Sequence, residues 1–438
     1  DDWEYMRFNG SMTNAAAALV LHRQRQGLDS RLVPLEELYD AYSAGRPNPY
    51  AIKRFLAYGL TNWSVPPAYV CLAGDGHLDY IDYYGQSVSR PNHVPPINDR
   101  IPYTLGGGNM METVGLDNLF GDMDGDGNPE VPIGRLPAQT PESLTYMINR
   151  IITHESADDW KNKVLMVADR SDNNEFAIVC DGLEDQVSPG MTVQRLNNSS
   201  SYSASTMRSY FIQAMNAGPS LALYVGHANN VGIGYYDYFF QHSYLVSYMS
   251  YLTNTVQSPL LLAGTCMFNN FAKPAPGSRC LGKGFLDTAP GGAVGVWASV
   301  ASASLYNSQE TASAIIDELF DHNDIRLGDL IRPALEFEAG SIAPWMARSS
   351  VLMGDPGTRI RTYFIFDHEP PAIQITAPTT NATLTVYTNR VNLAGTGSDG
   401  VGLRRVGIRN SRAAGETNAV GTTSWSLAGF ALAEGTNL

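Results

Sequence analysis

Two segments of the sequence end in residue types that together could do acyl-transfer chemistry. The apolar run Leu221–Val225 leads through Gly226 into His227, and Leu260–Thr265 leads into Cys266. A thiol attacks as a thiolate, so at neutral pH it needs a nearby base or a positive field. A histidine on a neighbouring strand could take the thiol proton and later protonate a leaving amine. His227 and Cys266 are therefore candidates for nucleophilic catalysis, although from spacing alone each could also be an ordinary loop or packing residue.

Short apolar runs alternate with amphipathic stretches up to about residue 365. The predicted strands are Ala68–Ala73, Val164–Ala168, Ser220–Val225, Pro259–Ala263 and Ala293–Ala298. The predicted helices are Ala15–Gln26, Pro49–Tyr58, Pro141–His154, Ser205–Ala217, Gln309–Phe320 and Leu327–Ala339. Several strands are apolar throughout, which indicates burial on both faces. The alternation predicts an α/β fold with a mainly parallel sheet flanked by helices, in which ligands gather beyond the carboxyl ends of the strands.

The character of the chain changes after Phe366. Residues 367–371 (DHEPP) form a predicted linker, because proline fixes the backbone and removes hydrogen-bond donors. Beyond it, alternating runs separated by Gly, Asn, Ser and Thr predict a β-sandwich. These runs are Ala372–Thr376, Ala382–Tyr387, Val391–Gly395 and Leu403–Ile408. We expect an N-terminal α/β subdomain at 1–155, a catalytic α/β subdomain at 156–366 and a truncated β-sandwich at 370–438.

Composition excludes several classes of protein. The chain has 44% hydrophobic and 16% charged residues, which is typical of a well-packed globular protein. With a formal net charge of −14 and no Lys/Arg-rich run, nucleic acid is not an expected partner. No window of 18 apolar residues occurs, so no transmembrane segment is expected. The four cysteines form no C-x-x-C pair of the kind that binds zinc.

Six ordered segments make the chain resemble the gingipain-type cysteine peptidases, which share the caspase-like fold. They are Ile52–Leu56 with Pro66–Tyr80 (PPAYVCLAGDGHLDY), Gly121–Pro137 (GDMDGDGNPEVPIGRLP), Tyr224–His227, Ala263–Cys266, Gly291–Val294 and Val351–Pro356 (VLMGDP). The resemblance covers nearly all of residues 10–362. It implies a caspase-like α/β peptidase, and in that family an immunoglobulin-like module commonly follows the peptidase domain. It therefore implies that residues 370–438 are such a module.

The resemblance also implies roles for individual residues. Cys266 would be the nucleophile and His227 the general acid/base, with the backbone amides of Cys266 and Ala228 binding the oxyanion. Ala228 departs from the family pattern, which has glycine there, and would be strained if the position required a positive φ. Asp169, at the end of a predicted strand, could orient His227, or could instead cap a helix or turn.

The residue that selects the substrate is expected within Asp172–Asp181. Glu175 and Asp181 are the acidic candidates, but Phe176 or Cys180 could equally occupy the family position, so the family's preference for arginine is not carried over. Ser299, after a predicted strand, is expected to line the same pocket. The aromatic run Tyr235–Phe240 could be a substrate wall or part of the core.

A second motif stands independently of the first. Oxygen-bearing side chains alternate at Asp122, Asp124, Asp126, Asn128 and Glu130, with Gly127 at the sixth position. This is the beginning of an EF-hand-type loop, in which glycine permits the sharp turn that lets the acids converge. The twelfth position is Ile133, so a bidentate acid must come from elsewhere. We expect a structural calcium ion here and no catalytic cofactor; the alternative is a solvated acidic turn.

The resemblance thus implies a secreted or bacterial cell-surface cysteine endopeptidase that acts on proteins or peptides through a thioester acyl-enzyme. One alternative is a transpeptidase of the same fold at the cell envelope, which hands the acyl group to an amine. Another is a non-catalytic surface or adhesion protein that has kept the fold.

Overall fold

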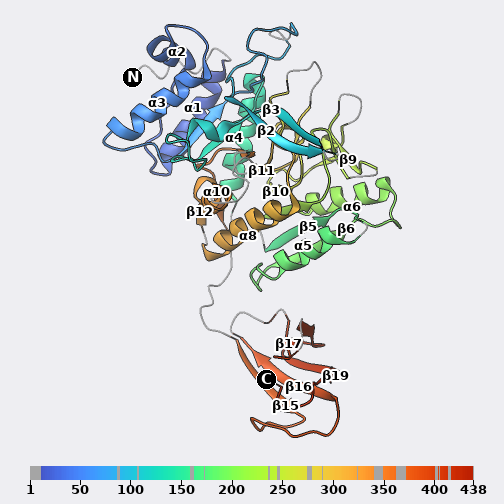
Figure 1. Cartoon of the computed structure of the whole chain (residues 1–438). Helices are drawn as coiled ribbons and strands as arrows, with labels where there is room; N and C mark the ends of the chain where they lie inside the picture. The colour runs from blue at the N-terminus through green and yellow to red at the C-terminus, as the bar shows by residue number, and fades with distance from the viewer. Residues whose placement is uncertain are drawn as a thin grey trace. The chain divides into compact units, whose positions relative to one another are not determined.

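The computed structural model divides into two compact units, residues 1–187 with 193–363, and residues 188–192 with 364–438. Figure 1 shows the elements along the chain. The structure describes residues 11–85, 89–105, 108–157, 162–171, 173–234, 237–243, 247–273, 279–288, 290–322, 324–339, 349–361, 371–399, 403, 405–412 and 416–437. The linker predicted at 367–371 lies outside these residues, apart from Pro371.

An eight-stranded sheet organises the first unit. In spatial order its strands are β1 (Val70–Ala73), β4 (Ile133–Leu136), β13 (Ser350–Met353), β11 (Gly295–Ser299), β10 (Leu260–Gly264), β7 (Leu221–Val225), β5 (Lys163–Ala168) and β6 (Thr192–Asn197). The strands β11, β10, β7 and β5 form one parallel set. The strands β13, β4 and β1 form a second parallel set. The two sets are joined by the antiparallel pairing of β11 with β13. The predicted α/β class with a mainly parallel sheet is confirmed.

Helices cover both faces of this sheet. They are α1 (Met12–Arg25), α2 (Leu35–Ser43), α3 (Pro49–Asn62), α4 (Pro141–Ser156), α5 (Glu175–Glu184), α6 (Ala204–Asn216), α7 (Leu281–Asp287), α8 (Leu305–Asp321), α9 (Leu327–Leu330) and α10 (Arg332–Ala339). On one face α8 packs on β10 and beside α5, and on the other α4 packs between α1 and α7. Short 3-10 helices lie at Asp117–Phe120 and Met249–Tyr251.

Local sequence explains where several helices begin. The side chains of Ser11, Asn48, Thr140, Ser203 and Ser304 each accept a backbone N–H in the first turn of the helix that follows. The single helix predicted for Leu327–Ala339 is instead two helices, α9 and α10. Pro333 explains the break, since its missing N–H is tolerated only in a first turn.

Several elements escaped the sequence prediction. They include α2, α5, α7, the small hairpin β8 (Gly232–Ile233) with β9 (Phe240–Gln241), and the pair β12 (Asp324–Arg326) with β14 (Arg359–Arg361). The largest is the antiparallel hairpin of β2 (Asn98–Leu105) and β3 (Gly108–Gly115). This hairpin brings Glu112 toward the segment after Cys266, where Asn270 Nδ2 donates to Glu112 Oε1 over 3.3 Å.

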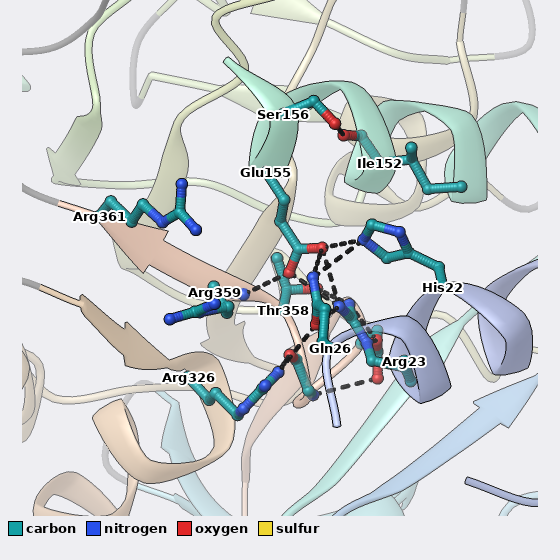
Figure 2. A network of polar contacts seen from close by, with 12 residues as sticks. His22, Arg23, Gln26, Ile152, Glu155, Ser156, Arg326, Thr358, Arg359 and Arg361 are labelled. Atoms are coloured by element: carbon teal, nitrogen blue, oxygen red, sulfur yellow. Dashed lines mark hydrogen bonds and ion pairs between the residues drawn. The ribbon is translucent and has the colours of Figure 1, made fainter. Parts of the chain in front are cut away.

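A buried charge network joins distant parts of the first unit, as Figure 2 shows. Arg23 of α1 donates to Glu155 of α4 over 2.8 Å and to Asp355, just after β13, over 2.6 Å. Glu155 also contacts His22 and accepts the backbone N–H of Arg359 over 2.6 Å. Arg23, Glu155 and Asp355 are all buried. Their pairing compensates the large cost of removing these charges from water.

A second buried pair lies beside β4. The guanidinium of Arg135 makes two hydrogen bonds to Asp117, of 2.6 and 2.7 Å, and two to the carbonyls of Gly74 and Val94. Arg135 is fully buried and lies over the ring of Phe271. The arginine therefore ties β4 to the segment after β1 and to the segment around Val94.

The second unit consists of antiparallel strands. β15 (Ala372–Ala377), β16 (Arg390–Ser398) and β19 (Ser424–Ala431) form one sheet, and β17 (Gly407–Arg409) pairs with β18 (Glu416–Asn418). The strand predicted at Ala382–Tyr387 is wrong: that segment is almost wholly exposed and pairs with no described strand. Its alternating pattern had no partner to pack against. An immunoglobulin-like identity for this unit stays a prediction.

Among the described helices, none combines the length and the apolar character that crossing a membrane requires.

Candidate active site

Two neighbouring strands lead to His227 and Cys266 at the same edge of the sheet. β7 and β10 are parallel, with Val225 opposite Gly264 in their last described pair. His227 and Cys266 each lie two residues further along, so they occupy equivalent positions where the strands leave the sheet. Both residues are half-buried. A base and a thiol thus stand at the carboxyl edge, where parallel sheets present their functional groups.

The thiol of Cys266 is held by the backbone of one residue, Ala303. The backbone N–H of Ala303 donates to Sγ over 3.3 Å, and Sγ lies 3.6 Å from the carbonyl oxygen of Ala303. Burial raises the pKa of the Cys266 thiol, the N–H of Ala303 offsets part of that rise, and the carboxylate of Glu112 adds to it. The resting thiol is therefore neutral at ordinary pH and needs a base when it attacks.

The backbone turns sharply immediately after the thiol. Met267 has a φ of 56°, in the left-handed region that a non-glycine residue occupies only at a cost of roughly 1–2 kcal/mol. Its N–H donates to the carbonyl of Ala301 over 2.8 Å. This contact helps to hold the turn and so fixes where Cys266 presents its sulfur.

The main chain of His227 is held from both sides. Its N–H donates to Asp169 Oδ2 over 3.3 Å, and its carbonyl accepts the hydroxyl of Tyr224 over 2.6 Å. The other carboxylate oxygen of Asp169 accepts Asn198 Nδ2 over 3.0 Å. Burial and the neighbouring Asp169 raise the pKa of Tyr224 well above its ordinary value, so the hydroxyl keeps its proton and remains a donor.

Gly226 is required by the close approach of these groups. A Cβ at this position would lie 2.2 Å from the Cβ of Asp169 and 2.6 Å from the hydroxyl of Tyr224. Any larger residue would push Asp169 and Tyr224 away from the histidine. The glycine before His227 therefore makes room for the two groups that hold its backbone.

One aromatic contact to the imidazole was not expected. The ring of Phe176 packs edge-on against that of His227, with centroids 5.1 Å apart at 88°. Phe176 is buried near the start of α5, a helix that the sequence prediction missed. The family resemblance had marked Phe176 only as one residue that could occupy the specificity position, and not as a contact of the histidine. Tyr224 escaped notice because it lies inside an apolar run and looks like core.

Ala228 fits its position without left-handed strain. Among the described residues, the non-glycine residues with positive φ are Ala44, Asp82, Asn174 and Met267. The backbone at Ala228 instead forms an antiparallel bridge with Ile233. Having alanine where the family has glycine therefore costs no strain from a left-handed backbone at position 228. That the N–H groups of Ala228 and Cys266 bind an oxyanion stays a prediction.

The three residues predicted for the substrate pocket lie in different surroundings. Glu175 is exposed at the start of α5. Asp181, on the same helix, is largely exposed and pairs with Arg195 over 2.9 Å. Ser299 is buried and lies 2.9 Å from the hydroxyl oxygen of Ser349. It lines a small cavity together with Thr265, and neither acid lines that cavity. Asp172, the first residue of the predicted range, lies outside the described residues.

The acidic loop brings three carboxylates together. Oxygens of Asp122, Asp124 and Glu130 lie within 4.8 Å of one another. Glu130 was one of the residues expected to bind the ion, whereas Ile133, at the twelfth position, is buried in β4. The loop acids also accept backbone N–H groups, as from Gly125 to Asp122 over 2.8 Å. A set of hard oxygen donors fits Ca²⁺.

The described part of the aromatic run after the histidine belongs to the core. Phe239 and Phe240 are fully buried, and both pack against Phe211 of α6. Tyr238 is tied down by a contact with Asn229. Residues 235 and 236 lie outside the described part of the chain.

Comparisons with known proteins identify the family from one family model and show a similar fold in solved structures. The model of peptidase family C25 matches residues 7–361. The complex of the pro- and mature domains of RgpB from Porphyromonas gingivalis is similar at 19% identity, covering 81% of this chain and 78% of that one, with a TM-score of 0.56. The Arg-specific cysteine proteinase gingipain R (RgpB) gives 19% identity over 82% and 77% of the two chains, also with a TM-score of 0.56. A structure described as a protease is 15% identical, covers 88% of this chain and 83% of its own, and gives a TM-score of 0.55. No curated protein shows significant similarity to the chain.

Proposed function

Because the chain belongs to peptidase family C25, the gingipain family of cysteine peptidases, we propose that it is an endopeptidase in which Cys266 is the nucleophile and His227 the general acid/base. One observation carries this assignment. The two residues follow neighbouring parallel strands by the same two positions, so both lie beyond the carboxyl ends of these strands, at one edge of the sheet. The similarity to solved gingipain structures supports the same fold.

The first half of the reaction forms an acyl-enzyme. His227 takes the proton of the Cys266 thiol as Sγ attacks the carbonyl carbon of the substrate, which gives a tetrahedral oxyanion. Backbone N–H groups of Ala228 and Cys266 are the proposed donors to that oxyanion. The C–N bond then breaks, the leaving amine takes the proton from His227, and the acyl group remains on sulfur as a thioester.

The second half releases the acid. A water molecule gives one proton to His227 as its oxygen attacks the thioester carbonyl. The C–S bond breaks and the proton returns to sulfur, which restores the thiol and the neutral imidazole. Asp169 and Tyr224 hold the backbone of His227 through both steps, so the imidazole need not reorient between them.

Replacing the sulfur tests this assignment. Cys266→Ala should abolish cleavage of a denatured protein substrate while leaving the melting temperature close to that of the wild type. Iodoacetamide should label Cys266 in the folded enzyme, and the loss of cleavage should be proportional to the fraction of Cys266 that is labelled. Cys180→Ala is the matched control, since Cys180 is buried on α5. Cleavage by purified Cys266→Ala at the wild-type rate would refute the proposal, and a competing amine in the assay would reveal acyl transfer in place of hydrolysis.

We also propose a structural calcium ion at the acidic loop. Asp122, Asp124 and Glu130 would supply carboxylate oxygens to it, which would offset the repulsion between three converging negative charges. The ion would stabilise the turn that leads into β4. No step of the peptidase reaction depends on it.

We propose, as the family resemblance implies, that the protein is secreted or held at the bacterial cell surface. Immunodetection in culture medium, intact cells and lysate tests this, and a signal confined to the lysate fraction would contradict it.

A further inference from the structure

A small cavity of about 20 Å³ is lined by Thr265, the residue that precedes Cys266 in the chain. It lies between the ends of β10 and β11, the first turns of α8, and residues 349–350. Its lining consists of small Ala, Gly, Ser and Thr residues together with Leu262, Trp297 and Asn307. All of these side chains are uncharged, and most are small.

Two residues connect this cavity to the reacting sulfur. Thr265 immediately precedes Cys266, and Ala303 donates its backbone N–H to Sγ over 3.3 Å. Both residues belong to the lining. The carbonyl that Sγ attacks belongs to a substrate residue whose own side chain lies within a few bonds of the sulfur. The cavity is therefore within reach of that side chain.

Two polar atoms in the lining lack partners. Thr265 Oγ1 and Asn307 Nδ2 are buried and make no hydrogen bond within the described part of the chain. Thr265 as a whole is 3% exposed. Buried polar groups are costly to leave unsatisfied, so such atoms mark a place where something else completes the bonding. Here the amide offers a donor, and the hydroxyl offers both a donor and an acceptor.

We infer that this cavity receives the side chain of the residue whose carbonyl Cys266 attacks, and that it selects a small uncharged polar side chain such as that of Ser, Thr or Asn. The inference rests on the proposed peptidase function. A hydroxyl or amide group accepts from Asn307 and bonds with Thr265, which satisfies both buried atoms at once.

Charge and polarity exclude other side chains. A buried guanidinium or ammonium group needs a carboxylate partner, and the lining supplies none. The acids of α5 do not compensate, because Asp181 pairs with Arg195 and neither it nor Glu175 borders the cavity. The volume exceeds the roughly 10–15 Å³ that one water molecule requires by only a small margin. An apolar side chain of any size would leave Thr265 Oγ1 and Asn307 Nδ2 unpaired, so polarity and not volume separates Asn from Leu.

Peptidyl electrophiles that differ only in the side chain beside the reactive carbonyl test the subsite. The rate of Cys266 modification, followed by intact mass, should be at least about tenfold higher with Ser, Thr or Asn at that position than with Leu, Lys or Arg. Hydrolysis of the matching peptides should follow the same order. Equal rates, or faster modification by the basic compounds, would overturn the inference. Equal rates are what the cavity would give if it held only a buried water.

Two variants connect the preference to the named atoms. Asn307→Leu removes the donor at similar size, and Thr265→Val removes the hydroxyl at similar shape. Each should reduce the preference for Ser, Thr and Asn over an aliphatic side chain by about tenfold. Glu318→Gln, near the other end of α8, is the control and should leave the preference unchanged. An unaltered preference in both cavity variants would refute the role of these atoms.

The two proposals fail in different ways. Selective modification of Cys266 without hydrolysis of any peptide would contradict the endopeptidase and leave the subsite standing. Hydrolysis through Cys266 that favours arginine or lysine would contradict the subsite and leave the endopeptidase standing.

Discussion

The hydroxyl of Tyr224 donates a hydrogen bond of 2.6 Å to the backbone carbonyl of His227, three residues further along the chain. Asp169 accepts the N–H of the same residue. The catalytic histidine of the proposed mechanism is thus held through its own peptide groups. The sequence suggested that Asp169 orients His227, and the backbone contact offers a physical route by which it could do so.

Removing the Tyr224 hydroxyl should slow the chemistry without weakening substrate binding. A neutral hydrogen bond contributes about 0.5–1.5 kcal/mol, so Tyr224→Phe should lower kcat by roughly 2- to 10-fold and leave KM nearly unchanged. The pH profile of kcat should also shift. Tyr146→Phe is the control, since its hydroxyl donates to the carbonyl of Pro290 and not to the site. Equal losses of kcat in both variants would indicate a general effect on stability.

The raised pKa of Cys266 should be visible in alkylation. Burial raises it, so the rate with iodoacetamide should keep increasing with pH beyond the range of an ordinary thiol. Glu112→Gln removes a charge that adds to this rise and should move the profile to lower pH. Glu37→Gln, an exposed change on α2, should leave it in place. A profile unaffected by Glu112→Gln would show that the carboxylate does not act on the thiol.

The network around Glu155 should make the protein sensitive to acid. Burial alone would raise the pKa of Glu155, but Arg23, the N–H of Arg359 and His22 together lower it. A carboxylate with a lowered folded pKa contributes stability above its unfolded pKa of about 4.3, and loses that contribution as the pH falls through the folded pKa. Urea unfolding at a series of pH values should therefore show stability falling below about pH 4–5.

Two variants distinguish the contribution of Glu155 to acid sensitivity from that of other carboxylates. Glu155→Gln should be less stable at neutral pH and should show a shallower acid decline than the wild type. Glu37→Gln should keep the wild-type slope. If Glu155→Gln also kept that slope, the acid sensitivity would have another origin.

Breaking the pair beside β4 should be severe. Arg135→Met leaves the Asp117 carboxylate buried without its partner, which should cost about 3–5 kcal/mol of unfolding free energy in urea melts. The double variant Arg135→Met, Asp117→Leu should recover part of that loss, because no charge remains buried. Arg31→Ala breaks an exposed pair with Asp29 and should cost about 0–1 kcal/mol. Equal losses for the buried and exposed pairs would contradict the assignment.

Calcium should stabilise the enzyme through the acidic loop. A ligand at 100 times its Kd adds about 2.7 kcal/mol, so thermal melts with Ca²⁺ should exceed those with a chelator by a few degrees. Asp124→Asn with Glu130→Gln should remove the difference, whereas Asp126→Asn, outside the converging group, should keep most of it. A melting temperature independent of Ca²⁺ in the wild type would exclude the site.

The sequence revealed the sheet because its strands are almost wholly apolar. The runs that end before His227 and Cys266 could be located by composition alone. Their pairing could not, because strand order is set by packing across the whole sheet. Tyr224 shows the same limit: its burial was evident, but its hydroxyl bond depends on a glycine two residues later.

Errors in the sequence prediction also have physical causes. Ala382–Tyr387 alternates without a partner strand to pair with, so the pattern alone was misleading. The sequence prediction missed Glu112 because the residues of its hairpin have mixed polarity. Glu112 also lies far from Cys266 in the sequence, and only the fold brings the hairpin near the segment that follows the thiol. Glu130 was one of the residues expected to bind calcium, but that it, with Asp122 and Asp124, completes the converging set required the fold of the turn.

The pairing of β4 with β13 has a consequence for synthesis of the chain. Arg135 faces Met353 in that register, and Arg23 reaches Asp355 across 332 residues of sequence. Contacts between such distant segments slow folding, since a long loop must close before they form. On the ribosome, β1 and β4 emerge long before the strand that joins them to the rest of the sheet. The strands that lead to His227 and Cys266 can therefore pair before β1 and β4 join the sheet. That joining requires residues 350–361, which are made later.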